Sequence, residues 1–313
     1  MRFNIKKMAN VHGLNDNRNN NNNNIFRNYR IANNGENNGE NNGMFLLGGN
    51  DNVKPREETF WHFLKNLFCP RLEYKSFIFI ITIINIITYI LTLILFGVKE
   101  IDTNTSFLTP KNLEKFSLSS SEMKKNKLTG SYRWITNCLL HGNFLHLLMN
   151  TISLLIFGTL TEALIKTLNI TIIYILSGLI GGLFSLLAEN TQSVGASICI
   201  YGVFGAFIAF FIMKWKEADN IFGPSGKCCM FSFFCFFIFF SLFIQIGSIG
   251  NTNINVYGHL GGLLSGYFIG CILIVPQNND DCMCFDYKFW KIFSLVILLA
   301  FTVLGGVYFY VFS

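Results

Sequence analysis

The sequence predicts an all-α polytopic membrane protein. Of its 313 residues, 51% are hydrophobic and only 13% are charged, whereas a soluble domain usually has about 25% charged residues. Apolar runs of about 20 residues, the length that a helix needs to cross a bilayer, recur along the chain. We therefore expect seven transmembrane helices, at 76–97, 144–165, 170–188, 196–213, 230–247, 256–275 and 289–310.

The segment ahead of the first apolar run has a different composition. Residues 1–59 include an unbroken run from Asn19 to Asn24 and hold few apolar side chains. Such a segment cannot bury enough surface to fold, so we expect it to be disordered. Aromatic and leucine residues within 60–68 predict a short amphipathic helix on the membrane surface.

Lysine and arginine residues indicate the orientation. They are frequent in residues 1–75 and present in the loop at 214–229, but absent from the loops at 189–195 and 248–255. The positive-inside rule therefore predicts a cytoplasmic N-terminus, although the long outer loop at 98–143 also carries basic residues. This bias explains the net charge of +6, so we expect the lipid bilayer, and no nucleic acid, as a partner.

The nine cysteines do not suggest a disulfide scaffold. They lie mostly within expected spans or on the cytoplasmic side, where disulfides are disfavoured. The pairs Cys228–Cys229 and Cys282–Cys284 lack the usual spacing of zinc ligands, and reversible acylation is the better interpretation. We expect no metal and no cofactor.

A set of polar residues begins three of the expected spans. Ser197 opens one span, His259 lies near the start of another, and His141, His146 and Asn150 cluster where a third begins. Serine in such a helix often serves only packing, but histidine inside a membrane span is rare and usually functional. In the expected topology all three spans run from outside to inside, which places His146, Ser197 and His259 within roughly 10 Å of the outer boundary.

This set can perform nucleophilic catalysis. A serine hydroxyl needs a base, and His259 is the natural partner of Ser197. The Ser197 N–H, the His146 ring and the Asn150 amide are candidate donors to an oxyanion. No aspartate lies within the spans to orient the base, so we expect a dyad, with Tyr201 packing against the imidazole.

Other features of the spans are expected to be structural. Glu162 lies roughly 24 Å beyond His146 along a helix, too far for a catalytic triad, and is expected to pair with Lys166. Glycines spaced by four predict that spans 196–213 and 256–275 are neighbours. The phenylalanine-rich span at 230–247 is expected to face lipid and to specify little chemistry.

Three spaced motifs together resemble the rhomboid family of intramembrane serine proteases, over about residues 76–275. The first has Arg133 and His141 followed by His146 and Asn150, the second is Gly195-Ala196-Ser197 with Tyr201, and the third is His259 with Gly262 and Gly266. The resemblance implies a cytoplasmic tail at 1–75, a six-helix catalytic core at 76–275, and an inner loop with a seventh helix at 276–313.

The same resemblance implies the residue roles. Ser197 would be the nucleophile and His259 the general base, with His146 and Asn150 in the oxyanion hole. Tyr201, Gly195, His141 and Arg133 would support them. Span 230–247 and the loop at 248–255 would admit single-span membrane proteins as substrates. The asparagine tracts resemble those of apicomplexan parasites, whose rhomboids process surface adhesins.

Two residues depart from the family pattern. Ile198 replaces a frequent glycine and is expected to narrow the space beside the scissile bond, while Tyr132 replaces a tryptophan and is expected to loosen the loop before Arg133. Ile198 also leaves open an inactive rhomboid-like protein that binds client transmembrane helices. A transporter is a third possibility, but transporter sites lie near the bilayer midplane.

Overall fold

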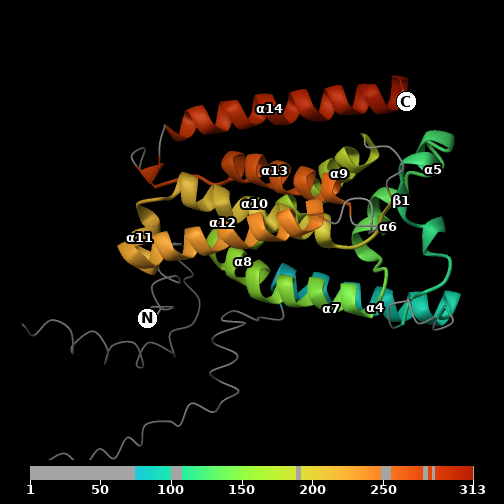
Figure 1. Cartoon of the computed structure of the whole chain (residues 1–313). Coiled ribbons are helices and arrows are strands. Elements are labelled where there is room, and N and C mark those ends of the chain that lie inside the picture. The colour runs from blue at the N-terminus through green and yellow to red at the C-terminus, as the bar shows by residue number, and fades with distance from the viewer. Residues whose placement is uncertain are drawn as a thin grey trace, which may run out of the picture.

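The structure is a computed structural model that describes residues 75–99, 108–187, 192–247, 255–277, 281–283 and 286–312. The expected disordered tail, the amphipathic helix at 60–68 and most of the loop at 248–255 lie outside these residues. The described part is a bundle of long helices, with short elements at either end (Figure 1). This arrangement confirms the all-α polytopic class.

Long helices occupy all seven stretches expected to span the membrane. Six of them are long and apolar enough to do so, and the seventh, α10, has 17 residues. The second stretch contains a π-helical turn, η2 (Leu154–Gly158), between α7 and α8. The long helices are α4 (Phe77–Phe96), α7 (Phe144–Ser153) with α8 (Thr159–Ile165), α9 (Thr167–Leu187), α10 (Ser197–Met213), α12 (Pro224–Gly247), α13 (Val256–Leu273) and α14 (Tyr287–Val307).

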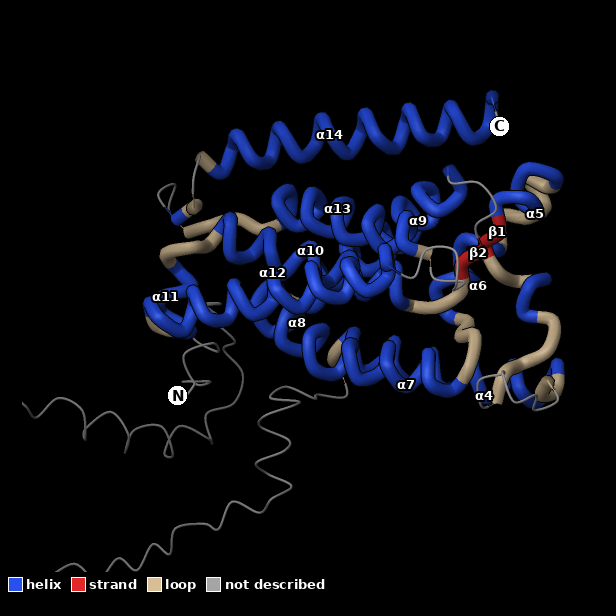
Figure 2. The backbone as a smooth tube through the Cα atoms, viewed as in Figure 1, coloured by secondary structure: helices blue, strands red, loops and turns tan. Residues whose placement is uncertain are grey.

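Short elements connect these helices. At the end of the bundle where α10 begins, two short strands pair antiparallel and form the red patch of Figure 2. At the other end, α11 joins α10 to α12. The short elements are η1 (Leu113–Lys115), β1 (Leu118–Ser119), α5 (Ser120–Lys125), α6 (Arg133–Leu139), β2 (Gln192–Ser193), α11 (Glu217–Phe222) and η4 (Tyr308–Phe312).

Helix α10 lies at the centre of the bundle. It contacts α8, α9, α12 and α13, and nearly all of its side chains are buried. A helix that is apolar on every side is either buried within a protein or faces lipid, and the contacts of α10 show that it is buried. The hydrophobic core therefore gathers around α10, with Phe207, Phe210 and Phe211 fully buried.

Glycines bring α10 and α13 into close contact, which confirms that these two spans are neighbours. A Cβ atom on Gly266 would overlap the backbone of Gly202, and one on Gly205 would overlap the Leu263 carbonyl. Small residues at a crossing let two helix backbones approach closely. The crossing fixes the distance between the first turns of the two helices.

Glu162 has a different role from the one expected. Its carboxylate accepts hydrogen bonds from the Ser76 hydroxyl (2.6 Å) and from the backbone N–H groups of Phe77 (2.9 Å) and Ile78 (3.1 Å). The expected pair with Lys166 is therefore wrong. The unpaired N–H groups and positive dipole at the start of α4 attract the carboxylate, while Lys166 is exposed.

Tyr132, which was expected to loosen the loop before Arg133, makes contacts that hold it. Its hydroxyl donates to the Lys115 carbonyl (2.9 Å), and its ring lies 5.4 Å from the Arg133 guanidinium. Arg133 is buried and donates to the carbonyls of Glu114 (3.1 Å) and Ser117 (2.7 Å). Together the two side chains hold the loop to the start of α6.

Candidate active site

Ser197 is placed by the segment that precedes α10. Strand β2 pairs with β1, and the Gly195 N–H then donates to the Asn137 carbonyl (2.8 Å). Gly195 has a φ of 128°, a conformation that favours glycine. The chain turns there and enters α10, so Ser197 is the first residue of the helix.

His259 lies in the first turn of α13. The Asn255 side chain caps this helix by accepting from the Gly258 N–H (2.9 Å), and it also donates to Ser185 on α9. The imidazole is buried, and its Nε2 atom lies 2.7 Å from the Ser197 hydroxyl oxygen. Because α10 and α13 cross closely, the two side chains expected to form a dyad are within hydrogen-bond distance.

Tyr201 packs flat against His259. The ring centroids are 4.6 Å apart and the rings are inclined by 15°. Tyr201 lies one turn after Ser197 on α10, so its ring restricts the imidazole from below. This contact agrees with the packing expected from the spacing.

Gln245 is a site residue that sequence reasoning missed. Its side-chain oxygen lies 2.5 Å from Nδ1 of His259, and its Nε2 lies 2.6 Å from the Tyr201 hydroxyl and 3.2 Å from the Ser241 hydroxyl. The expectation that span 230–247 specifies little chemistry is therefore wrong at this end of α12. The available signal was one amide, with a serine four residues before it, in a phenylalanine-rich span.

His146 and Asn150 lie over the turn that leads to Ser197. A Cβ atom on Gly195 would come within 2.7 Å of His146 Nε2 and 3.5 Å of Asn150 Nδ2. Asn143 fixes this part of α7 by capping the helix, with its side chain accepting from the His146 N–H (2.8 Å). Asn150 Nδ2 is buried and has no hydrogen-bond partner among the described residues. The site thus holds a spare donor beside the turn that leads to Ser197.

His141 packs against His146. Among the hydrogen bonds of the described residues, none joins His141 to Ser197. Its ring is fully buried, with the centroid 5.4 Å from that of His146, and its Nδ1 lies 3.1 Å from the Leu139 carbonyl. Burial, and then the neighbouring His146, lower the pKa of His141 to about 3. His141 is therefore neutral near pH 7 and acts as a packing partner.

The comparisons with known proteins agree with this geometry. The family model described as the rhomboid domain matches residues 129–276, which include every candidate site residue. Related sequences come from plants, bacteria and apicomplexans. The chain is a rhomboid family protein.

Three relatives illustrate the range. RHOMBOID-like protein 6, mitochondrial, from Arabidopsis thaliana is 32% identical over 177 residues, covering 55% of this chain and 54% of that protein. Rhomboid-like protease 3 of Toxoplasma gondii is 27% identical over 212 residues, 66% and 73% of the two chains. Rhomboid protease GluP of Bacillus subtilis is 27% identical over 185 residues, 58% and 32%. The chain thus spans about half the length of the Arabidopsis relative.

Ile198 packs where α9, α10 and α13 meet. It is fully buried, and its side chain contacts the positions of Gly181 on α9 and of Gly258 and Gly262 on α13. The expectation that Ile198 narrows the space beside a scissile bond is therefore wrong. The side chain fills the junction of three helices, where glycines leave room for it.

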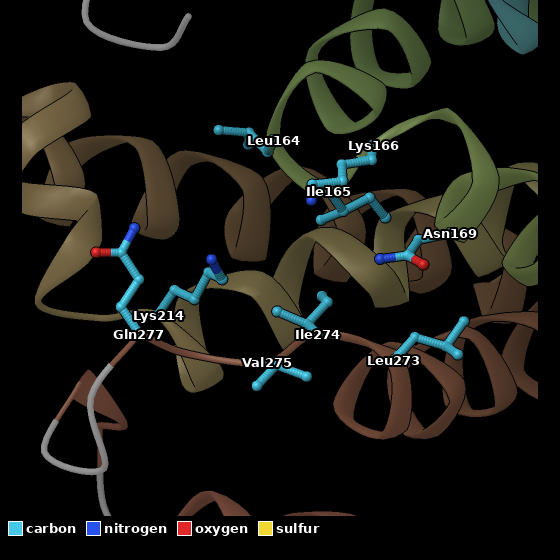
Figure 3. Close-up of a pocket in the computed structure, with 9 residues that line it drawn as sticks. All are labelled: Leu164, Ile165, Lys166, Asn169, Lys214, Leu273, Ile274, Val275 and Gln277. Atoms are coloured by element: carbon cyan, nitrogen blue, oxygen red, sulfur yellow. The ribbon is translucent and has the colours of Figure 1, made fainter. Parts of the chain in front are cut away.

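A pocket of about 300 Å³ lies at the other end of the rhomboid domain (Figure 3). Its lining includes Lys214, which follows α10 and pairs with Glu217 at 2.8 Å. The 17 residues of α10 separate Lys214 from Ser197 by about 25 Å. None of the candidate catalytic residues lines this pocket, so it is not part of the site.

Proposed function

We propose that this rhomboid family protein is an intramembrane serine protease with Ser197 as nucleophile and His259 as general base. The observation that carries the proposal is the 2.7 Å contact between the Ser197 hydroxyl and His259 Nε2. Packing alone does not require a serine and a buried histidine to meet at the start of two apolar helices. Two of the relatives also carry the name protease.

The first step is acylation of the enzyme. The Ser197 hydroxyl oxygen attacks the scissile carbonyl carbon as His259 Nε2 takes the hydroxyl proton. The resulting imidazolium then gives that proton to the leaving amine, and an ester to Ser197 remains. A water molecule, deprotonated by the same nitrogen, hydrolyses the ester and regenerates the hydroxyl.

Developing negative charge on the carbonyl oxygen needs donors. The Ser197 N–H lies at a helix start, where backbone N–H groups have no partner within the helix. The unpartnered Asn150 Nδ2 and the His146 ring lie over the adjacent Gly195 turn. These three groups form the proposed oxyanion hole, which in a site sheltered from water contributes a large part of the catalysis.

The length of α10 supports chemistry inside the bilayer. Its 17 residues rise by about 25 Å, which is less than the roughly 30 Å of the hydrocarbon core. If Lys214, at the C-terminal end of α10, lies at one boundary of the hydrocarbon core, Ser197 lies inside the core and does not reach the opposite boundary. The positive-inside pattern favours the outer side as the nearer boundary for Ser197.

The proposed substrates are single-span membrane proteins. A peptide bond within a helix has its carbonyl hydrogen-bonded and shielded, so a substrate helix must unwind near the site before attack. Helix-breaking residues near the outer end of the substrate span would ease this step. Surface adhesins are one such class of membrane protein, and we include them among the proposed substrates.

Cleavage of a panel of single-span reporters in liposomes tests this function. The wild type is expected to cut at least one reporter, and Ser197→Ala and His259→Ala are expected to lose about 10³-fold or more in rate. Ser265→Ala is the matched control, because Ser265 lies on α13 and donates to the Gly261 carbonyl. If the wild type binds reporters without cutting any of them, the helix-binding alternative replaces the protease.

A further inference from the structure

We propose that Gln245 is a positioning residue that selects the reactive form of His259. This inference rests on the proposed function, because it assigns a role within the same site. A neutral imidazole carries one proton, and the nitrogen that faces the serine must be the bare one if it is to act as a base. The contacts of Gln245 decide which nitrogen that is.

The amide oxygen of Gln245 can only accept a hydrogen bond. It lies 2.5 Å from Nδ1 of His259, so Nδ1 carries the proton and donates it. Nε2, which lies 2.7 Å from the Ser197 hydroxyl oxygen, is then the unprotonated nitrogen. The same amide oxygen also stabilises the imidazolium that forms during attack. Both nitrogens of an imidazolium are donors, so Nδ1 still donates to the amide oxygen.

Gln245 also makes hydrogen bonds through its amide nitrogen. Its Nε2 lies 2.6 Å from the Tyr201 hydroxyl and 3.2 Å from the Ser241 hydroxyl, which are 2.5 Å from each other. Both hydroxyl oxygens can accept from the amide N–H groups in the orientation that the structure shows, with the amide oxygen directed at His259. Tyr201 therefore fixes the imidazole twice, by stacking on it and by holding Gln245.

Helix α12 is otherwise mostly apolar, so packing does not explain the polar side chain of Gln245. Phe236, Phe239 and Phe243 point outward with about two thirds of their surface exposed. An amide inside an apolar span is costly unless its hydrogen bonds are made. Gln245 and Ser241 are four residues apart and share the face of α12 that meets Tyr201.

Helix α12 otherwise contacts the catalytic helices sparingly. It packs less against α10 and α13 than those two helices pack against each other. The hydrogen bonds of Gln245 therefore link a loosely packed helix to the general base. An outward displacement of this end of α12 would release Nδ1 of His259.

Two measurements test the role of Gln245. The first is the rate at which a fluorophosphonate probe labels Ser197 in detergent, since this rate reports the reactivity of the serine without any substrate helix. Gln245→Met keeps the side-chain length but has no acceptor, and is expected to label roughly 10- to 100-fold more slowly than the wild type. Gln245→Glu keeps an acceptor oxygen and is expected to label at least about tenfold faster than Gln245→Met.

Ser232→Ala is the matched control. Ser232 is an exposed polar residue of α12, outside the site, so the labelling rate should stay within about twofold of the wild type. Thermal unfolding of each variant separates a loss of folded protein from a loss of reactivity. Equal labelling rates for Gln245→Met and the wild type would overturn the assignment.

The second measurement is the ¹⁵N NMR spectrum of the protein in which the histidine side chains are labelled with ¹⁵N. The chain has five histidines, and His259→Ala identifies the signal of His259. The wild type is expected to hold the proton on Nδ1, and Gln245→Met to shift it toward Nε2. A wild-type proton on Nε2 would overturn the proposal whether or not Ser197 labels, whereas failure of wild-type labelling alone would count against the protease.

Discussion

Asn150 carries a hydrogen-bond donor that the described part of the protein leaves unused. Its Nδ2 is buried beside the Gly195 turn, and a buried donor without a partner costs about 1–3 kcal/mol. A catalytic role is one reason why a protein retains such a group. The position next to Ser197 suits an oxyanion that exists only during the reaction.

Asn150→Ala is therefore expected to lower kcat by about 100-fold and to leave KM nearly unchanged. The reason is that the donor would bind the transition state more strongly than the bound substrate. Reporter cleavage in liposomes measures both constants. Asn169→Ala makes the same change at the distant pocket and serves as the control. A kcat within about twofold of the wild type would remove Asn150 from the oxyanion hole.

Motif spacing predicted that Ser197, His259 and Tyr201 would lie together. Ser197, His259 and Tyr201 are recognisable because each lies near the start of an apolar helix at a fixed spacing. Gln245 was not predictable in this way, because its contact with His259 crosses between two helices and leaves no spacing to read. The role of Ile198 depended likewise on the direction of its side chain.

The crossing of α10 and α13 determines the geometry of the contact between Ser197 and His259. Gly202 and Gly266 place the two backbones in contact below the site. The glycine spacing predicted this neighbourhood, but not the pairing of Glu162 with the start of α4. Sequence separation hides that contact, since Glu162 and Ser76 are 86 residues apart.

Gly266→Ala is expected to lower both stability and activity. The added Cβ would overlap the Gly202 backbone, which cannot rotate away as a side chain can. Overpacking of this kind costs about 1–3 kcal/mol. The forced separation of α10 and α13 should slow cleavage by about tenfold or more.

Gly306→Ala on α14 is the matched substitution, because a Cβ there meets no atom within 4 Å. It should leave the midpoint of thermal unfolding and the cleavage rate near their wild-type values. Equal unfolding midpoints and equal cleavage rates for Gly266→Ala and Gly306→Ala would show that α10 and α13 do not cross in close contact in solution.

The molecule as a whole has two chemically distinct ends. Ser197, His259 and the β1–β2 pair lie at one end, and the Lys214–Glu217 pair lies at the other (Figure 1). The basic residues predict that the second end faces the cytoplasm. The amino-acid sequence predicted this polarity through the loop charges and through the position of the polar residues near the start of three spans.

Thiol labelling tests the proposed orientation. Cys228 and Cys229 are exposed near the start of α12, at the end opposite the dyad. In sealed right-side-out vesicles, an impermeant maleimide should reach them only after permeabilisation. A cysteine introduced by Leu128→Cys, where the side chain is 84% exposed near the dyad end, should react without it. The reverse pattern would contradict a cytoplasmic N-terminus.

The most direct test of the Ser197–His259 assignment is mass spectrometry of the protein after treatment with a fluorophosphonate, which needs no knowledge of the substrate. The wild type is expected to carry one adduct, located on Ser197. Ser197→Ala should carry no adduct. His259→Ala should form the adduct at least about 100-fold more slowly than the wild type. An unmodified Ser197 in folded wild-type protein, or equal labelling in His259→Ala, would contradict the account.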